Sequence, residues 1–185
     1  LYLLPTSGAA FYKYDEMTNK WKIVYEEKLK PSERGLIKMS IGNALREVNF
    51  VPPEKVYGKL IEDRKTQITF SALGQKAPVE LKEAWDRDGS KRRAIKAAIE
   101  RRLVYFDVRV GGKSSVDVTR KGIDKGYGLS KLLTELSISK ESVLFVGDEL
   151  QEGGNDFPVK ALGVECVEVK GVEDTKKVIS ELLQG

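Results

Sequence analysis

The stretch that most limits what this chain can fold into is LFVGDELQEGGNDFPV, from Leu144 to Val159. Its first residues are apolar and predict a buried strand, which ends in Gly147-Asp148. After residue 115, strand and helix patterns alternate, as is typical of a parallel α/β sheet. Ligands of open α/β sheets bind outside the carboxyl ends of the strands. We therefore expect the acidic turn to lie at a binding edge.

Carboxylate and amide side chains are concentrated in this turn. Asp148 follows the strand directly, and Asn155 and Asp156 come after Gly153-Gly154. Such oxygens are suitable ligands for a hard cation such as Mg²⁺. A solvated surface turn is the alternative, but it leaves the two glycine-acid motifs without a joint explanation. The sequence therefore predicts a metal site with Asp148 and Asp156 as ligands.

The composition excludes several kinds of chemistry. The chain has 185 residues, a net charge of +4, no histidine and a single cysteine, Cys166. Catalysis by Ser-His-Asp or Cys-His groups is therefore impossible, and carboxylates, lysine, arginine, hydroxyls or an oxygen-bound metal must serve instead.

One cysteine cannot form an internal disulfide and suits a reducing compartment, so we expect a cytoplasmic protein. No apolar run is long enough to span a bilayer, and we expect no membrane partner.

A lysine precedes the predicted helix that leads into the acidic strand. It is Lys125, within DVTRKGIDKGYGL from Asp117 to Leu129. A surface lysine is the simpler interpretation of such a residue. Next to a metal-carboxylate site, however, an ammonium group is able to neutralise a phosphate oxygen.

Hydrophobic periodicity predicts the other elements. Up to residue 118 we expect a mixed α+β pattern, with helices at 31–48, 78–85 and 90–102 and strands at 21–25, 56–62, 66–71, 104–110 and 114–118. Beyond it we expect helices at 128–136, 157–162 and 174–183 and strands at 142–146 and 164–169.

Two stretches together carry a family resemblance. DVTRKGIDKGYGL followed by LFVGDELQEGGNDFPV resembles the third and fourth motifs of the haloacid dehalogenase (HAD) superfamily. IEDRKTQITFSALGQKAP and GGKSSVDV are similar to the cap of the eukaryotic-type phosphomannomutases. The resemblance implies an α/β fold, a HAD-like Rossmannoid core with an inserted α+β cap domain. Its segments would be residues 1–15 (core), 16–115 (cap) and 116–185 (core).

The resemblance also implies a function. It is a Mg²⁺-dependent phosphotransferase or phosphatase that acts on a sugar phosphate through an aspartyl-phosphate. Lys125 would contact the transferring phosphoryl group, Asp148 would bind Mg²⁺, and Asn155 and Asp156 would complete or orient the site. In the cap, the substrate-binding residues would be Arg64, Thr69, Lys82, Ser115 and Asp117.

Some of these cap residues can also be interpreted without the family resemblance. The planar fork of an arginine such as Arg64 suits a dianionic phosphate, although a surface arginine in a hairpin turn is the alternative. Ser115 and Asp117 share one face of their strand by period-two spacing, and a cross-strand surface pair is the alternative.

Two departures from the family pattern matter. Phosphomannomutases have arginines where this chain has Gln75 and Lys82, which weakens the grip on a second phosphate and favours phosphatase activity. No Asp-x-Asp follows an apolar strand, and Asp86-Arg87-Asp88 is interpreted as a turn and helix cap. We therefore expect a HAD core that is incomplete at the N-terminus, a truncated piece that is inactive alone. An unpaired edge of the strand at 143–146 would then favour self-association.

Two other functions remain open. The helix SKRRAIKAAIERR, Ser90 to Arg102, presents basic side chains that are able to contact nucleic-acid phosphates, although a solvated helix face explains them more simply. A catalytically dead HAD-like interaction protein is the third interpretation.

Overall fold

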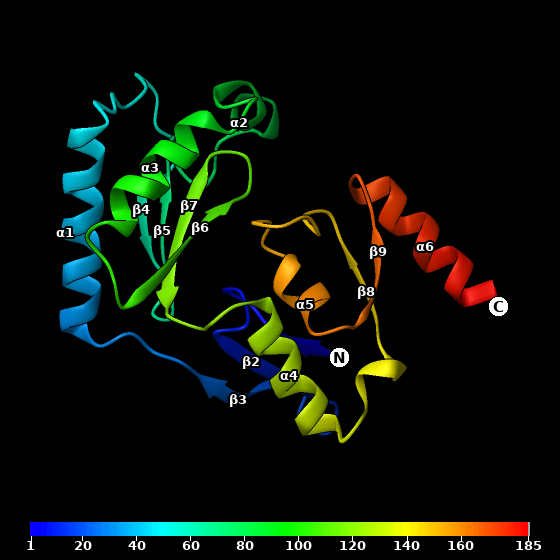
Figure 1. The fold of residues 1–185 in the computed structure, drawn as a ribbon. Coiled ribbons are helices and arrows are strands. Elements are labelled where there is room, and N and C mark those ends of the chain that lie inside the picture. Colours follow the sequence, from blue (N-terminus) through cyan, green and yellow to red (C-terminus); the bar gives the residue numbers. More distant parts are fainter. Residues whose placement is uncertain (185) are drawn as a thin grey trace. The chain divides into compact units, whose positions relative to one another are not determined.

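The computed structural model describes residues 1–184, which form two compact units (Figure 1). The first comprises Leu1–Ile123, and the second begins at Asp124. Each unit is described separately below. Within residues 1–184, no helix is both long and apolar enough to cross a membrane.

The first unit contains a four-stranded antiparallel sheet with the strand order β4-β5-β7-β6. Its strands are β4 (Ile61–Asp63), β5 (Ile68–Ser71), β6 (Phe106–Gly111) and β7 (Ser115–Arg120). Three helices accompany it, α1 (Pro31–Glu47), α2 (Val79–Trp85) and α3 (Ser90–Glu100). Apolar side chains of α1 and α3 pack in one core with those on one face of the sheet, including Phe70 and Val116.

Because side chains alternate along a strand, the opposite face of this sheet is polar. The residues between the core positions are Thr69 and Ser71 on β5 and Ser115 and Asp117 on β7. The sheet therefore has an apolar face that holds the unit together and a polar face, on which Thr69 and Ser71 are each 3% exposed.

Helix α1 forms where the periodicity predicts it. Pro31 occupies the first turn, where its missing N–H loses no bond. The Glu33 carboxylate accepts a hydrogen bond from the Lys30 N–H at 2.5 Å and so satisfies the chain just before the helix. Ile37, Ile41 and Ala44 are fully buried at helical spacing.

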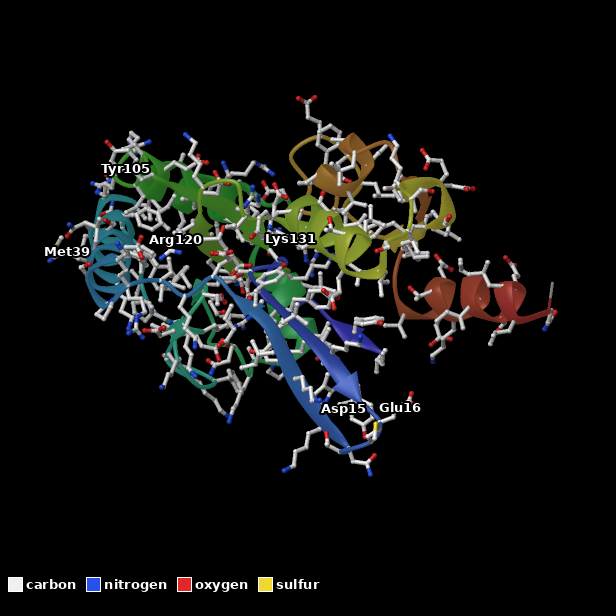
Figure 2. All side chains as sticks on the ribbon, turned by 90° about the horizontal axis from the view of Figure 1, so that it is seen from below. Asp15, Glu16, Met39, Tyr105, Arg120 and Lys131 are labelled. Carbon is white, nitrogen blue, oxygen red and sulfur yellow. The ribbon has the colours of Figure 1, made fainter. Side chains whose placement is uncertain are left out.

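A second sheet in this unit has the order β1-β2-β3, with β1 (Tyr2–Leu3), β2 (Ala10–Asp15) and β3 (Lys20–Glu26). Figure 2 shows β2 and β3 as a hairpin with Asp15 and Glu16 at its tip. Phe11 is fully buried, and its ring meets those of Tyr2 and Tyr25 edge to face at centroid distances of 5.9 and 5.8 Å. These aromatic contacts hold the base of the hairpin.

The second unit alternates helix and strand. Its elements are α4 (Lys125–Leu136), a 3₁₀ turn η1 (Lys140–Ser142), β8 (Leu144–Gly147), α5 (Phe157–Ala161), β9 (Glu165–Glu168) and α6 (Val172–Gln184). Strands β8 and β9 pair in parallel, as the alternation predicts. Leu129, Val159 and Val164 form the centre of a small core between α4, α5 and β9.

Three expectations need correction. The strand expected at 56–62 is wrong except for its end, because Gly58 has a φ of +91° and Tyr57 bonds to Leu73 and Lys76 of a neighbouring turn instead of a strand. Helix α4 begins three residues earlier than expected, because the Asp124 carboxylate caps it. Strand β8 is only half-buried, since β9 is its one strand neighbour within residues 1–184.

Candidate functional site

The acidic turn of the second unit is organised by one carboxylate. Asp156 is 1% exposed, and its Oδ2 accepts the backbone N–H groups of Asp148 and Glu149, each at 3.1 Å. Its Oδ1 accepts a hydrogen bond from the ammonium group of Lys125. Asp156 therefore joins the end of β8 to the first residue of α4.

Two glycines allow this close approach. A Cβ on Gly147 would lie 2.6 Å from Oδ2 of Asp156, and a Cβ on Gly154 would lie 2.1 Å from the carbonyl oxygen of Glu149. Contacts this short require neighbouring atoms to move, namely the Asp156 and Phe145 side chains at Gly147 and the Glu149 backbone at Gly154. Gly147 and Gly154 therefore fit the geometry of the turn better than any residue with a Cβ.

Lys125 is positioned by its helix. It is the first residue of α4, and the Asp124 carboxylate before it accepts the Tyr127 N–H at 2.9 Å. The Lys125 side chain is 36% exposed, so its ammonium group is held by Asp156 and still partly open to solvent. A fixed cation of this kind is suited to a dianionic phosphate.

The donors in the turn fit a hard cation. Asp148 is exposed, and the side-chain oxygen of Asn155 is buried without a hydrogen-bond partner. Mg²⁺ is usually held by one or two protein oxygens and keeps its other positions for water and substrate phosphates. Within residues 1–184, no group of three or more His, Cys, Asp or Glu side chains is placed to hold a metal ion. Asp156 already accepts three N–H groups, and its role as a metal ligand stays a prediction.

A second polar cluster lies on the polar face of the four-stranded sheet. Strand register aligns Thr69 with Asp117 and Ser71 with Ser115. The Thr69 hydroxyl donates to Asp117 Oδ1 at 2.6 Å, and the hydroxyls of Ser71 and Ser115 are 3.0 Å apart. The structure therefore brings together three of the residues expected to bind substrate.

The Asp117 carboxyl is electrostatically unusual. Burial raises its pKa above 3.8, while the hydrogen bond from Thr69 and the charge of Arg64 partly oppose that shift. Arg64 is exposed, and its Nε donates to Glu62 at 2.6 Å. Arg64 thus acts on the charge of Asp117 without a direct bond to it among the described contacts.

Lys82 lies on α2 and is tied to its own loop. Its ammonium group donates to the Gln75 carbonyl at 2.9 Å, and the Gln75 side-chain oxygen accepts the Lys59 N–H at 2.7 Å. These two positions, where the family resemblance predicts arginines, therefore brace the segment before α2.

Asp86-Arg87-Asp88 caps α3, as interpreted from the sequence. Asp86 accepts the N–H groups of Lys91 and Arg92 at 2.9 and 3.0 Å and pairs with the Arg92 guanidinium at 2.7 Å. Asp88 accepts the Ser90 N–H at 3.1 Å.

Several basic residues of α3 and of the two positions after it form ion pairs within the unit. Arg92 pairs with Asp86, Lys96 with Glu100, and both Arg101 and Arg102 with Glu47. These pairs neutralise part of the positive charge of this segment, and nucleic-acid binding stays an open alternative.

Sequence reasoning missed two polar-face residues, Gln67 and Arg109. Gln67 donates to Thr69 at 2.9 Å, and Arg109 lies opposite Asp117 in the register of β6 and β7. Gln67 is two positions before Thr69, a spacing that indicates the same face, but the register of β6 has no signal in the sequence.

Comparisons with known proteins agree with this architecture. Residues 38–185 match the family model described as eukaryotic phosphomannomutase. A phosphomannomutase of Encephalitozoon cuniculi is 27% identical over 195 residues, which cover 99% of this chain and 71% of the relative. One of Spinacia oleracea is 29% identical over 131 residues, which cover 68% of this chain and 51% of the relative.

Solved structures show the same fold at low identity. An N-terminally truncated, IMP-bound IMP-nucleotidase of Plasmodium falciparum has a TM-score of 0.63 at 19% identity, over 100% of this chain and 48% of that one. SMU.1108c from Streptococcus mutans has a TM-score of 0.58 at 17% identity, over 97% of this chain and 75% of that one. The chain thus spans about half the length of the nucleotidase and of the spinach relative.

At such identities a structural likeness speaks for the fold alone. The expected α/β fold class is therefore confirmed. The family model is more specific, because its match extends over most of the sequence. The chain belongs to the eukaryotic phosphomannomutase family.

Proposed function

We propose that the second unit provides half of a Mg²⁺-dependent site for phosphoryl transfer to or from a sugar phosphate. The observation that carries this proposal is the bond between Lys125 and the buried Asp156, which also binds the N–H groups of Asp148 and Glu149. A cation and an exposed carboxylate are thereby fixed at the end of β8. Such fixed charges stabilise a phosphoryl group without reorganisation during reaction.

Each residue has a distinct part in this proposal. Lys125 neutralises an oxygen of the transferring phosphoryl group, and Asp156 keeps its ammonium group in place. Asp148 and Asn155 would hold Mg²⁺, with Asp156 as a further ligand. The ion, when bound, offsets negative charge on the phosphate.

The first unit would select the substrate. We assign Arg64 and Lys82 to an anionic group of the sugar phosphate, and Thr69, Ser115 and Asp117 to its hydroxyl or phosphate oxygens. In this scheme residues 16–115 are the cap, and residues 1–15 and 116–185 belong to the core. Because Gln75 and Lys82 bond to their own loop, the grip on a second phosphate is weaker. Phosphatase activity is therefore favoured over mutase activity.

The nucleophile of a HAD reaction is an aspartate that becomes phosphorylated. The Asp-x-Asp sequence at 86–88 is used to cap α3 and does not suit this role. We infer that the 185-residue chain alone binds sugar phosphates without turnover. We also expect self-association through the second edge of β8, which sedimentation analysis over a range of protein concentrations would test.

Calorimetric titration with mannose 6-phosphate, with and without Mg²⁺, tests the proposal. Lys125→Met should weaken binding about 10-fold to 100-fold, because a charge-assisted hydrogen bond contributes about 1.5–3 kcal/mol. Lys131→Met is a matched control, since Lys131 is on the same helix (Figure 2) and stacks on Tyr127 instead. Equal binding by both variants would contradict the role of Lys125. Absence of any binding by the wild type would overturn the proposal and favour an interaction protein.

A further inference from the structure

Gln67 is a buried polar residue that none of the roles above uses. It is 2% exposed and immediately precedes β5, on the polar face of the four-stranded sheet. Its side-chain nitrogen donates to the Thr69 hydroxyl at 2.9 Å, while its side-chain oxygen is buried without a partner. A buried acceptor without a donor is uncommon in folded proteins and calls for an explanation.

The orientation of the amide follows from the protons available. A threonine hydroxyl has one proton, and Thr69 gives it to Asp117 at 2.6 Å. Towards Gln67, the Thr69 oxygen is therefore only an acceptor, and the amide must present its N–H₂ group to it. A flipped amide would place two acceptors against each other. The free position of the Gln67 oxygen is thus fixed by the network.

The same network leaves a pair of acceptors on one face. Asp117 lies opposite Thr69 in the strand register and takes the Thr69 proton on Oδ1, while Gln67 donates to the same Thr69 oxygen. The carbonyl oxygen of Gln67 and the carboxylate of Asp117 both accept hydrogen bonds, so the group that they fit must donate. Neutral donors that a sugar phosphate carries are its hydroxyl groups.

We propose that Gln67 is a specificity-determining residue whose side-chain oxygen accepts a hydrogen bond from a hydroxyl of the sugar. This inference rests on the proposed function and narrows its substrate class to sugar phosphates that carry a hydroxyl at the matching position. An analogue that lacks this hydroxyl should bind more weakly than the parent sugar phosphate, because it leaves the Gln67 oxygen buried and unpaired in the complex. Because the Gln67 oxygen is buried in the free protein, this contact requires the side chains beside it to move when the sugar binds.

A thermodynamic cycle tests the proposal. Binding of glucose 6-phosphate and of its 2-deoxy, 3-deoxy and 4-deoxy analogues is measured by calorimetry for the wild type and for Gln67→Met, a change of similar size and shape. The wild type should bind one of the analogues about 10-fold to 100-fold more weakly than the parent. In Gln67→Met that ratio should fall to about one, because the acceptor is absent in both complexes.

Gln75→Met is the matched control. The Gln75 oxygen already accepts the Lys59 N–H, so this change should leave the ratio between parent and analogue as it is in the wild type. The wild-type ratios test the proposal even if Gln67→Met does not fold.

The outcomes separate the two proposals. Equal binding of all analogues by the wild type, or a ratio that persists in Gln67→Met, would overturn the role of Gln67 and leave the proposed function standing. If the wild type binds neither mannose 6-phosphate nor glucose 6-phosphate nor any analogue, the proposed function fails and this inference fails with it.

Discussion

Replacement of Asp156 by asparagine tests the organisation of the acidic turn most directly. The change keeps the shape of the side chain and removes its charge. One oxygen can still accept the N–H groups of Asp148 and Glu149, but the amide nitrogen then faces the ammonium group of Lys125. A hydrogen bond to a charged group contributes about 1.5–3 kcal/mol, and loss of one partner of a buried ion pair costs about 3–5 kcal/mol.

The Lys125 side chain is 36% exposed, so water recovers part of that loss. We therefore expect the free energy of unfolding of the second unit to fall by about 2–3 kcal/mol. With a urea dependence of about 1 kcal/mol per molar for a unit of this size, the midpoint should move down by about 2–3 M. Urea unfolding followed by circular dichroism, with hydrogen exchange at the Asp148 and Glu149 amides, measures the change.

Glu173→Gln is the control in the same unit. Glu173 pairs with Lys176 at 2.7 Å on α6, but its side chain is 78% exposed, and such surface pairs contribute less than about 1 kcal/mol. A midpoint shift for Asp156→Asn no larger than that of Glu173→Gln would refute the view that Asp156 organises the turn.

Three further predictions concern other parts of the molecule. Burial raises the pKa of Asp117 above 3.8, so the folded state holds this proton more tightly than the unfolded state. As pH rises above 3.8, ionisation of Asp117 therefore lowers the free energy of unfolding of the wild type. Asp117→Asn lacks this carboxyl, so its stability relative to the wild type should increase over that range. Equal urea midpoints of the two proteins at all pH values would contradict this. Gly35 lies in α1, and a Cβ added there would meet no other atom within 4 Å, so Gly35→Ala should stabilise the protein by about 0.5–1 kcal/mol. Gly154→Ala should instead destabilise it by more than about 1 kcal/mol, because the added Cβ meets the Glu149 backbone. Thermal unfolding of both variants shows whether the two effects have opposite signs. Asp86→Ala removes a buried cap and ion pair of α3 and should lower stability by about 3–5 kcal/mol in urea unfolding, and a change below 1 kcal/mol would disprove its structural role.

Local patterns predict much of this fold. Helix α1 has apolar residues at helical spacing, and the parallel pairing of β8 with β9 follows from alternating elements. The start of α4 was missed although Asp124 is a typical N-cap residue. Residues 56–60 alternate like a strand, but the positive φ of Gly58 turns the chain into contacts that only the tertiary structure defines.

The candidate site likewise has some contacts that sequence spacing predicts and others that only the tertiary structure defines. Asp148 and Asp156 are close in sequence, so their common turn is predictable from spacing. Thr69 and Asp117 are 48 positions apart, and their contact depends on the register between β5 and β7. The unpaired oxygen of Gln67 depends further on where a single hydroxyl proton goes. Such details are beyond the reach of periodicity.

The bond between Lys125 and Asp156 has a consequence for folding. The two residues are 31 positions apart, so their contact requires α4 and the segment after β8 to have met already. The acidic turn cannot be completed by local interactions alone, because its central carboxylate is satisfied only in the assembled unit. We therefore expect the turn to form late and to open only when the second unit unfolds as a whole, so that it is one of the last parts of this unit to acquire its shape.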